Sequence, residues 1–163
     1  MLPQIRIGSG YDSHRLMAGR ELILCGKKIP FEKGLQGYSD ADAPVHALID
    51  AILGALALGD IGRHFPDTDP RYKNADSLSL LRTVLALPEL SDWIVGNADL
   101  TIHAEAPKLS PHIDDMRRNL ADALHIPQDC VSIKAKTAEK LGAVGAGEAM
   151  EAQAVVLMIR KTS

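Results

Sequence analysis

The stretch from residue 8 to residue 14, which reads GSGYDSH, most constrains the fold. Apolar residues alternate with other types just before it, which is typical of a β-strand. Residues two apart in a strand point to the same face, so Asp12 and His14 are predicted to lie side by side. Gly8 and Gly10 indicate a bulge, or the close approach of another chain segment or a ligand. Both Asp and His can bind a metal, and a catalytic zinc site needs about three protein ligands, so a third ligand must come from elsewhere in the chain.

The most regular helical pattern lies over residues 45–56, where apolar residues recur at helical spacing. Asp42 or Ser39 can cap the start of this helix. His46 falls in its first turn, at the edge of the apolar stripe. Asp50 lies one turn later on the same face, where it could orient the imidazole ring.

Asp12, His14 and His46 together form a candidate zinc site. Two imidazoles and one carboxylate suit zinc and leave a fourth position for substrate. The alternative is that these are ordinary polar residues that never meet. Glu139 follows a predicted strand end, where its carboxylate could hold a harder cation such as magnesium or manganese. For Glu139 the alternative is a solvent-exposed loop residue.

Periodicity and Gly/Pro punctuation predict the remaining elements. These are a hairpin over 22–30, loops over 32–38 and 59–70, a helix over 74–86, a strand over 95–106, a helix from 110 or 111 to 124, a strand over 131–136, a Gly/Ala loop over 143–147 and a strand over 149–160. The order fits a single α+β domain over residues 1–163, with a mostly antiparallel sheet and helices on one face. We expect a ferredoxin-like topology. The other face of the sheet would then need a cover, which an oligomer that packs these sheets together would provide.

Composition excludes several classes of protein. Aromatic residues make up only 4% of the 163 residues against 46% hydrophobic, so the core must be aliphatic. The net charge of −3 argues against a nucleic-acid-binding protein with a basic face. Cys25 and Cys130 are far apart and form no C-x-x-C pair, which favours a reduced cytosolic protein. With no long apolar run and little sequence before the first strand, we expect a cytoplasmic bacterial protein, or a plastid stroma protein trimmed of its transit peptide.

Phosphate binding is a second candidate chemistry. The segment 106–111 joins a predicted strand to a helix, and backbone N–H groups at a helix start favour phosphate; a plain turn is the alternative. The lysines that could add positive charge to such a pocket, or merely be scattered over the surface, are Lys108, Lys134, Lys136 and Lys140. Asp67 and Asp69 could bind a polyol hydroxyl or cap a turn.

Seven blocks, taken in order, resemble the motifs of the 2-C-methyl-D-erythritol 2,4-cyclodiphosphate synthase family. They are GYDSH at 10–14, SDAD at 39–42, HAL at 46–48, LGDIG at 58–62, FPDTD at 65–69, APK at 106–108 and TAEKLG at 137–142. The blocks cover nearly the whole chain with compatible spacing, which is far more specific than any one of them.

The resemblance implies an activity and an assembly. The 2-phosphate of 4-diphosphocytidyl-2-C-methyl-D-erythritol 2-phosphate would attack the β-phosphorus of the diphosphate, giving the cyclic diphosphate and CMP in the non-mevalonate route to isoprenoids. The enzyme would be a homotrimer with each active site between two subunits. An existing phosphate is the nucleophile, so catalysis would be positioning and charge neutralisation.

The resemblance also implies residue roles. Asp12, His14 and His46 match the zinc ligands, and Glu139 matches the ligand of magnesium or manganese. The implied catalytic positions are Tyr38, Ser39, Asp60, Thr137 and Glu139. The implied substrate-binding positions are Asp12, His14, Tyr38, Ser39, Asp60, Ile61, Gly62, Phe65, Pro66, Asp67, Thr68, Asp69, Ala104, Glu105, Ala106, Pro107, Lys108, Leu109, Ser110, Lys136, Thr137, Ala138 and Glu139. In this family residues 60–62 and 65–69 would surround the methylerythritol part, and residues 104–110 with Thr137 the cytidine.

Four positions depart from the family pattern. Tyr38 stands where a histidine is usual, and it is neutral at pH 7 although it can donate a hydrogen bond. Ala138 replaces a usual threonine. Ala143 and Ala146 replace an aromatic residue and an arginine, which argues against isoprenoid diphosphate binding in a central trimer cavity.

Two rival functions stay open at this point. One is a non-catalytic zinc-bound trimer that binds nucleotide or isoprenoid diphosphate, for which Tyr38 is the best argument. The other is a two-metal phosphatase or phosphodiesterase, which would need carboxylates bridging metals about 4 Å apart and water as the nucleophile.

Overall fold

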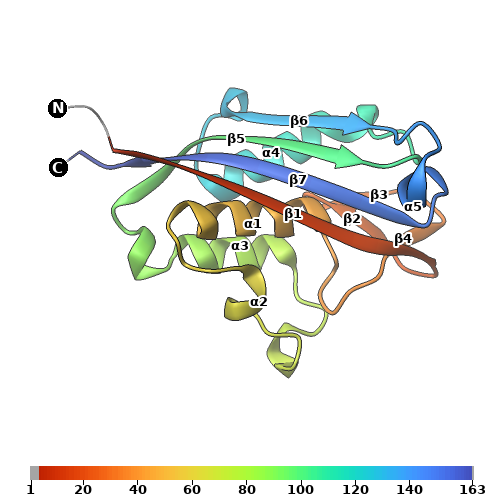
Figure 1. Cartoon of the computed structure of the whole chain (residues 1–163), viewed down its shortest axis with the longest axis horizontal. Coiled ribbons are helices and arrows are strands. Elements are labelled where there is room, and N and C mark those ends of the chain that lie inside the picture. The colour runs from red at the N-terminus through yellow and green to blue at the C-terminus, as the bar shows by residue number, and fades with distance from the viewer. Residues whose placement is uncertain (1–3, 163) are drawn as a thin grey trace.

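A five-stranded sheet in the order β4-β1-β7-β5-β6 forms the centre of the computed structural model, which describes residues 4–162 (Figure 1). Its strands are β1 (Ile5–Ala18), β4 (Lys33–Leu35), β5 (Trp93–His103), β6 (Val131–Lys136) and β7 (Ala149–Arg160). The neighbouring pairs are antiparallel except β5 and β6, which run parallel. Strands β2 (Leu22–Leu24) and β3 (Lys27–Ile29) form the predicted separate hairpin.

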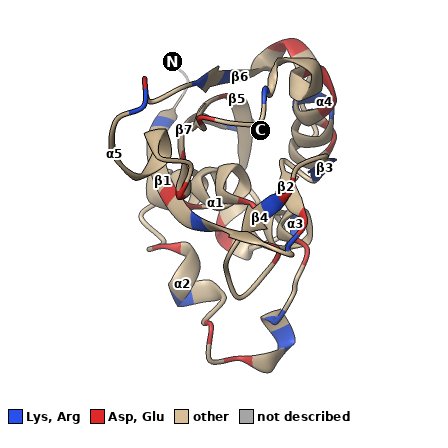
Figure 2. Ribbon diagram, turned by 90° about the vertical axis from the view of Figure 1, so that its right-hand side faces the viewer, with Lys and Arg blue, Asp and Glu red and all other residues tan. Residues whose placement is uncertain are grey.

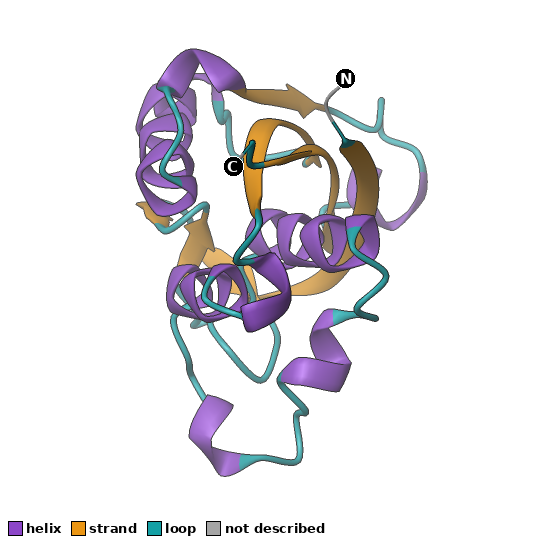
Figure 3. Ribbon diagram, turned by 90° about the vertical axis from the view of Figure 1, so that its left-hand side faces the viewer, coloured by secondary structure: helices purple, strands orange, loops and turns teal. Residues whose placement is uncertain are grey.

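The three long helices lie on one side of this sheet. The long ones are α1 (Ala43–Ala55), α3 (Ser77–Leu85) and α4 (Ile113–Leu124), and the purple turns below them in Figure 3 lie on the connection between α1 and α3. The short ones are α2 (Ile61–His64), α5 (Gly142–Gly145) and the 3₁₀ turns η1 (Pro70–Tyr72), η2 (Pro88–Leu90), η3 (Ser110–His112) and η4 (Gln128–Cys130). Helix α1 packs on β1 and β7, and α4 packs on β6. None of the helices in residues 4–162 is long and apolar enough to cross a bilayer.

The opposite face of the sheet is open in the single chain. Its side chains alternate with the buried ones along each strand, as period-2 geometry requires. The large hydrophobic and aromatic residues exposed on this face include Ile5, Ile7, Tyr11, Ile94 and Val155. Charged residues of both signs are interspersed along the ribbon in Figure 2, without a continuous basic stretch. Because these apolar side chains are exposed in the single chain, a cover over this face stays a prediction.

Two glycines let α1 lie directly on β1. A Cβ atom at Gly8 would come within 1.8 Å of the Ala51 carbonyl oxygen, and one at Gly10 within 1.9 Å of the Ala47 carbonyl oxygen. The close approach predicted from these glycines is thus made by the helix backbone. The predicted alternative of a bulge is wrong, because β1 pairs with β7 without a break from Ile5 onward.

Asp42 fixes the start of α1. Its carboxylate accepts hydrogen bonds from the backbone N–H groups of Val45 (3.3 Å), Cys25 (2.8 Å) and Gly26 (2.7 Å). The first bond caps the helix, and the other two tie the β2–β3 hairpin to it. Asp42 is fully buried, and burial raises its pKa to about 7 although these N–H donors oppose the shift. Of the two predicted caps, Asp42 is the one that caps this helix.

The predicted ferredoxin-like topology is wrong. That topology has the chain order β-α-β-β-α-β. Here the four main strands follow the order β1-α1-β5-α4-β6-β7, so that α4 connects β5 to its parallel neighbour β6. The predicted class is otherwise confirmed as a single α+β domain with a mostly antiparallel sheet.

Several predicted loops contain short regular elements. The 32–38 loop includes β4, the 59–70 loop includes α2, and the 143–147 loop overlaps α5. The Gly/Pro content of 59–70 predicts a loop throughout, but Asp60 caps one helical turn there by accepting the Arg63 backbone N–H at 3.0 Å. The second long helix begins at Ser77, not at residue 74, and β5 spans Trp93–His103 instead of 95–106.

The close packing of α1 on β1 predicts that Gly8→Ala destabilises the protein. The new methyl group has no space beside the Ala51 carbonyl, so α1 must shift away from the sheet. We expect a loss of about 1–3 kcal/mol in the free energy of unfolding, measured by urea denaturation.

Gly54→Ala is the matched control for this experiment. Its new Cβ would meet only the Ser9 carbonyl oxygen, at 3.8 Å. Alanine in a helix should stabilise the protein by about 0.5–1 kcal/mol relative to glycine. Equal stability of Gly8→Ala and the wild type would refute the close-packing argument.

Candidate metal centre and substrate pocket

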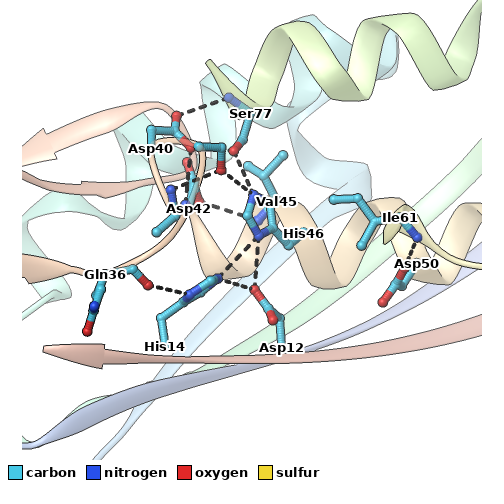
Figure 4. Close-up of polar contacts among 12 residues, drawn as sticks. Asp12, His14, Gln36, Asp40, Asp42, Val45, His46, Asp50, Ile61 and Ser77 are labelled. Carbon is cyan, nitrogen blue, oxygen red and sulfur yellow. Dashed lines mark hydrogen bonds and ion pairs between the residues drawn. The ribbon is translucent and has the colours of Figure 1, made fainter. Parts of the chain in front are cut away.

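Asp12, His14 and His46 meet, as predicted, between β1 and the first turn of α1 (Figure 4). The Asp12 Oδ2 atom lies 2.8 Å from His14 Nε2 and 3.1 Å from His46 Nδ1. The two ring nitrogens are 3.3 Å apart. Ligand atoms around a tetrahedral zinc ion with bonds of about 2.0–2.1 Å would lie about 3.3 Å apart. Three ligand atoms therefore converge with the spacing of a metal site, and the alternative that they never meet is wrong.

The outer nitrogen of His14 supports this assignment. His14 Nδ1 lies 2.8 Å from the Gln36 carbonyl oxygen, which can only accept a hydrogen bond. Nδ1 therefore carries a proton, and in the neutral ring the lone pair of Nε2 points at Asp12 and His46. Such a hydrogen bond from the outer nitrogen of a ligand histidine to a backbone carbonyl is common in metal sites. The donor set fits a divalent transition metal.

The same contacts shift the pKa values of two of the three groups. Burial opposes ionisation of Asp12, but hydrogen bonds with His14 and His46 outweigh it and lower its pKa to about 2. Burial also opposes charging of His14, but the hydrogen bond with Asp12 outweighs it and raises its pKa. Both shifts favour the charged form of the group concerned, and the ionised Asp12 carboxylate makes the cluster attractive to positive charge.

The outer nitrogen of His46 is held by serines, and not by Asp50 as predicted. His46 Nε2 lies 2.9 Å from Ser77 Oγ and 3.1 Å from Ser39 Oγ. Asp50 instead accepts the backbone N–H of Ile61 at 2.7 Å and so ties the start of α2 to α1. The helical spacing placed Asp50 on the correct face, but the loop after α1 takes up its carboxylate.

A pocket of about 240 Å³ adjoins the three ligands. It is lined by His14, Tyr38, Ser39, His46, Ile61, Gly62, Phe65, Asp67, Tyr72 and Leu80. Most of the predicted substrate-binding residues between 38 and 67 therefore lie around one cavity. Pro66 and Thr68 are exposed and do not line it.

The loop over this pocket is fastened at Tyr38. The Tyr38 hydroxyl donates to the Asp69 carbonyl oxygen at 3.2 Å. The rings of Phe65 and Tyr72 stack edge to face with centroids 5.1 Å apart. The Asp69 carboxylate accepts from the Arg71 backbone N–H at 3.0 Å, so of its two predicted roles it fills the turn-capping one. Tyr38 thus uses its hydroxyl to hold the loop.

Glu139 and its neighbours form a second cluster. Glu139 is exposed, and its carboxylate accepts the Thr137 hydroxyl at 2.8 Å. Glu139 and Lys140 both have positive φ angles, of 50° and 63°. The Glu105 carboxylate accepts the backbone N–H groups of Ala138 (3.2 Å) and Lys140 (3.4 Å), which holds this unusual turn. Glu105 therefore positions the Glu139 loop.

The segment 104–110 has both buried and exposed side chains. Ala104 and Leu109 are buried in the core, whereas Ala106, Lys108 and Ser110 are exposed. The bond from Ala106 to Pro107 is cis, and η3 follows. Neither this segment nor residues 136–139 line the pocket beside the three ligands. In one chain the predicted site is therefore split into two parts.

Three site residues were not predicted from the sequence. Tyr72 and Leu80 line the pocket, and Ser77 contacts His46. Ser77 follows Asp76, which accepts the Ser79 N–H and caps α3. A helix start can be read from such a cap, but nothing local shows that the first residue of α3 faces a histidine of α1.

Comparisons with known proteins agree on one family. The sequence profile of the YgbB family matches residues 5–159. A 2-C-methyl-D-erythritol 2,4-cyclodiphosphate synthase of Burkholderia thailandensis is 56% identical over 158 residues, covering 97% of this chain and 98% of that protein. The bifunctional IspDF of Campylobacter jejuni is 37% identical with a TM-score of 0.93, over 98% of this chain and 43% of that one. IspF of Plasmodium falciparum, solved as a CDP complex, is 34% identical with a TM-score of 0.85, over 99% and 100% of the two chains.

Proposed function

The chain belongs to the YgbB family of 2-C-methyl-D-erythritol 2,4-cyclodiphosphate synthases, and from this premise we propose how its residues carry the reaction. It is a lyase of the non-mevalonate isoprenoid pathway, converting 4-diphosphocytidyl-2-C-methyl-D-erythritol 2-phosphate to the cyclic diphosphate and CMP. An oxygen of the 2-phosphate forms a bond to the β-phosphorus while the bond from that phosphorus to the CMP oxygen breaks. The substrate supplies both nucleophile and leaving group, so the protein must orient them and offset their charge.

We propose that Asp12, His14 and His46 hold zinc, or another divalent transition metal. The observation that carries this is the convergence of one carboxylate oxygen and two ring nitrogens within 3.3 Å of one another. When bound, the metal would polarise the β-phosphate and lower its repulsion of the incoming phosphate. The Asp12 carboxylate and the rings of His14 and His46 would hold the ion beside the pocket that His14 and His46 also line.

The pocket lined by Ile61, Gly62, Phe65 and Asp67 is proposed to enclose the methylerythritol part of the substrate. The Asp67 carboxylate suits its hydroxyl groups, and the Phe65 ring excludes water from one wall. Asp60, the cap of α2, would hold residues 61 and 62 at this wall. Tyr38 and Ser39 would face the phosphates, with Tyr38 fixing the loop that covers them.

The second cluster is proposed to bind the nucleotide end of the substrate. Glu139 would hold magnesium or manganese, and Thr137 would contact the diphosphate. The segment 104–110, with Lys108 and Lys136, would bind the cytidine and its phosphate. The CDP complex of the Plasmodium falciparum relative supports a cytidine nucleotide as the ligand class.

We propose that the active enzyme is a homotrimer in which the two clusters meet across subunits. The open face of the sheet carries exposed Ile7, Tyr11 and Val155, which an assembly would remove from water. The two clusters of one chain do not form a single site, because the pocket beside His46 includes no residue from 104–110 or 136–139. The bacterial relatives support a cytoplasmic location.

Removal of one metal ligand tests the assignment of the catalytic centre. We expect purified His46→Ala protein to retain no stoichiometric transition metal, measured by plasma mass spectrometry. Its kcat/KM for CMP release should fall by more than about 100-fold, since even outer residues of metal sites are worth about 10–100-fold.

His125→Asn is a control that changes a histidine outside the site. His125 ends α4 with a φ of 56°, a conformation that asparagine tolerates. We expect normal metal content and turnover in this variant. Wild-type metal occupancy in His46→Ala would contradict the ligand assignment.

A charge on the open face tests the trimer. Val155→Lys puts an ammonium group in the middle of this face, so we expect sedimentation to shift from trimer to monomer and CMP release to fall. Thr83→Lys adds the same charge on the exposed surface of α3 and should leave both unchanged. A trimeric Val155→Lys protein would show that the assembly uses another surface.

A further inference from the structure

We propose that Ser77 and Asp40 form a hydrogen-bond relay that fixes the tautomer of His46 and thereby sets the affinity of the metal site. Both are positioning residues, since neither is within the group of ligand atoms. The proposal rests on the metal site proposed above. It adds the reason why Nε2, and not Nδ1, carries the proton of the His46 ring.

The direction of the hydrogen bonds in this relay follows from Asp40, its last residue. The Ser77 hydroxyl donates its only proton to Asp40 Oδ1. Asp40 can be the acceptor here because its other partners are also donors, the backbone N–H groups of Ser77 (3.0 Å) and Asp42 (3.2 Å). Toward His46, therefore, the Ser77 oxygen is available only as an acceptor.

The tautomer of His46 follows from this direction. Ser77 Oγ lies 2.9 Å from His46 Nε2, so this contact requires a proton on Nε2. A neutral imidazole with its proton on Nε2 has its lone pair on Nδ1. Nδ1 is the atom that faces Asp12 Oδ2 and His14 Nε2. Gln36 does the same for His14, so both rings direct a lone pair inward.

Ser39 makes the relay necessary. Its hydroxyl oxygen also lies near His46 Nε2, at 3.1 Å, and it accepts the Ala41 backbone N–H at 3.1 Å. Accepting the Ala41 N–H does not use the proton of the Ser39 hydroxyl, so Ser39 could donate this proton to His46 Nε2. That arrangement would place the ring proton on Nδ1, where a metal must bind. The Ser77–Asp40 pair opposes it by offering Nε2 an acceptor.

Burial makes this effect strong. Ser77 has no exposed surface, and Ser39 and His46 are 8% and 9% exposed. Water therefore has little access to supply an alternative partner for Nε2. Ser77 is the first residue of α3, so the relay also joins the metal ligand of α1 to the neighbouring helix.

Cobalt titration of the metal-free protein is the first test, with the visible spectrum of bound Co²⁺ as the readout. We expect Ser77→Ala to bind Co²⁺ about 10–100-fold more weakly than the wild type, the range typical of outer partners of metal sites. Asp40→Asn keeps the serine and the side-chain shape, and should weaken binding in the same direction, by less. It serves as the second variant if Ser77→Ala does not fold.

Ser79→Ala is the matched control. Ser79 lies two residues further along α3, and its hydroxyl also donates to an aspartate, Asp76 at 2.6 Å, without a hydrogen bond to a histidine among the described residues. We expect wild-type Co²⁺ affinity in this variant. If Ser77→Ala binds as tightly as Ser79→Ala, or both weaken equally, the relay is refuted.

The tautomer itself is read by nitrogen NMR of the metal-free protein labelled with ¹⁵N-histidine, at a pH where the ring is neutral. We expect the proton of His46 on Nε2 in the wild type and a shift toward Nδ1 in Ser77→Ala; His46→Ala identifies the signals. An unchanged tautomer overturns the proposal. Failure of the wild type to bind Co²⁺ would instead refute the metal site, while the tautomer measurement still tests the relay.

Discussion

The contact between β1 and α1 is the constraint on which the rest of the site depends. Gly8 and Gly10 remove the side chains that would hold the helix away, and Ala47 and Ala51 bring the helix backbone down onto them. His46 precedes Ala47, so this register carries its ring to the side chains that follow Gly10 along the same face of β1. Asp42 then fixes the start of the helix and joins it to the β2–β3 hairpin. A metal site thus results from backbone packing that two small residue types permit.

The division of the site and the exposed apolar residues of the open sheet face both fit the proposed assembly. The metal ligands and the pocket lie on the helix side of β1, whereas Thr137 and Glu139 lie on an exposed turn beyond β6. A single chain holds both clusters apart from each other, and the proposed assembly through the open face would bring the metal cluster of one chain to the Glu139 cluster of another. The assembly would bury Ile7 and Val155, which a monomer leaves exposed to water.

Much of this could be predicted from the sequence because the signals are local. Alternation around Asp12, the helical pattern after Asp42 and the ordered family motifs led to the Asp12, His14 and His46 cluster that the structure brings together, and to most of the elements. The failures are non-local: Asp50 was assigned to His46 because a helical spacing says nothing about the loop that binds its carboxylate. The ferredoxin-like topology was wrong because the main elements follow the order β-α-β-α-β-β, and the pairing of β5 with β6 as parallel neighbours depends on packing that no local pattern shows. Ser77 was missed for the same reason, since its contact with His46 is set by the packing of α3 on α1.

The central claim is that the metal held by Asp12, His14 and His46 is required for the cyclisation. Phosphorus NMR of the cytidyl substrate with the protein and magnesium, before and after a zinc chelator and again after zinc is returned, tests it most directly. The account predicts cyclic diphosphate together with CMP, a stop on chelation, and recovery with zinc. Cyclisation that continues in the chelated protein, or a linear hydrolysis product in place of the cyclic one, would contradict it.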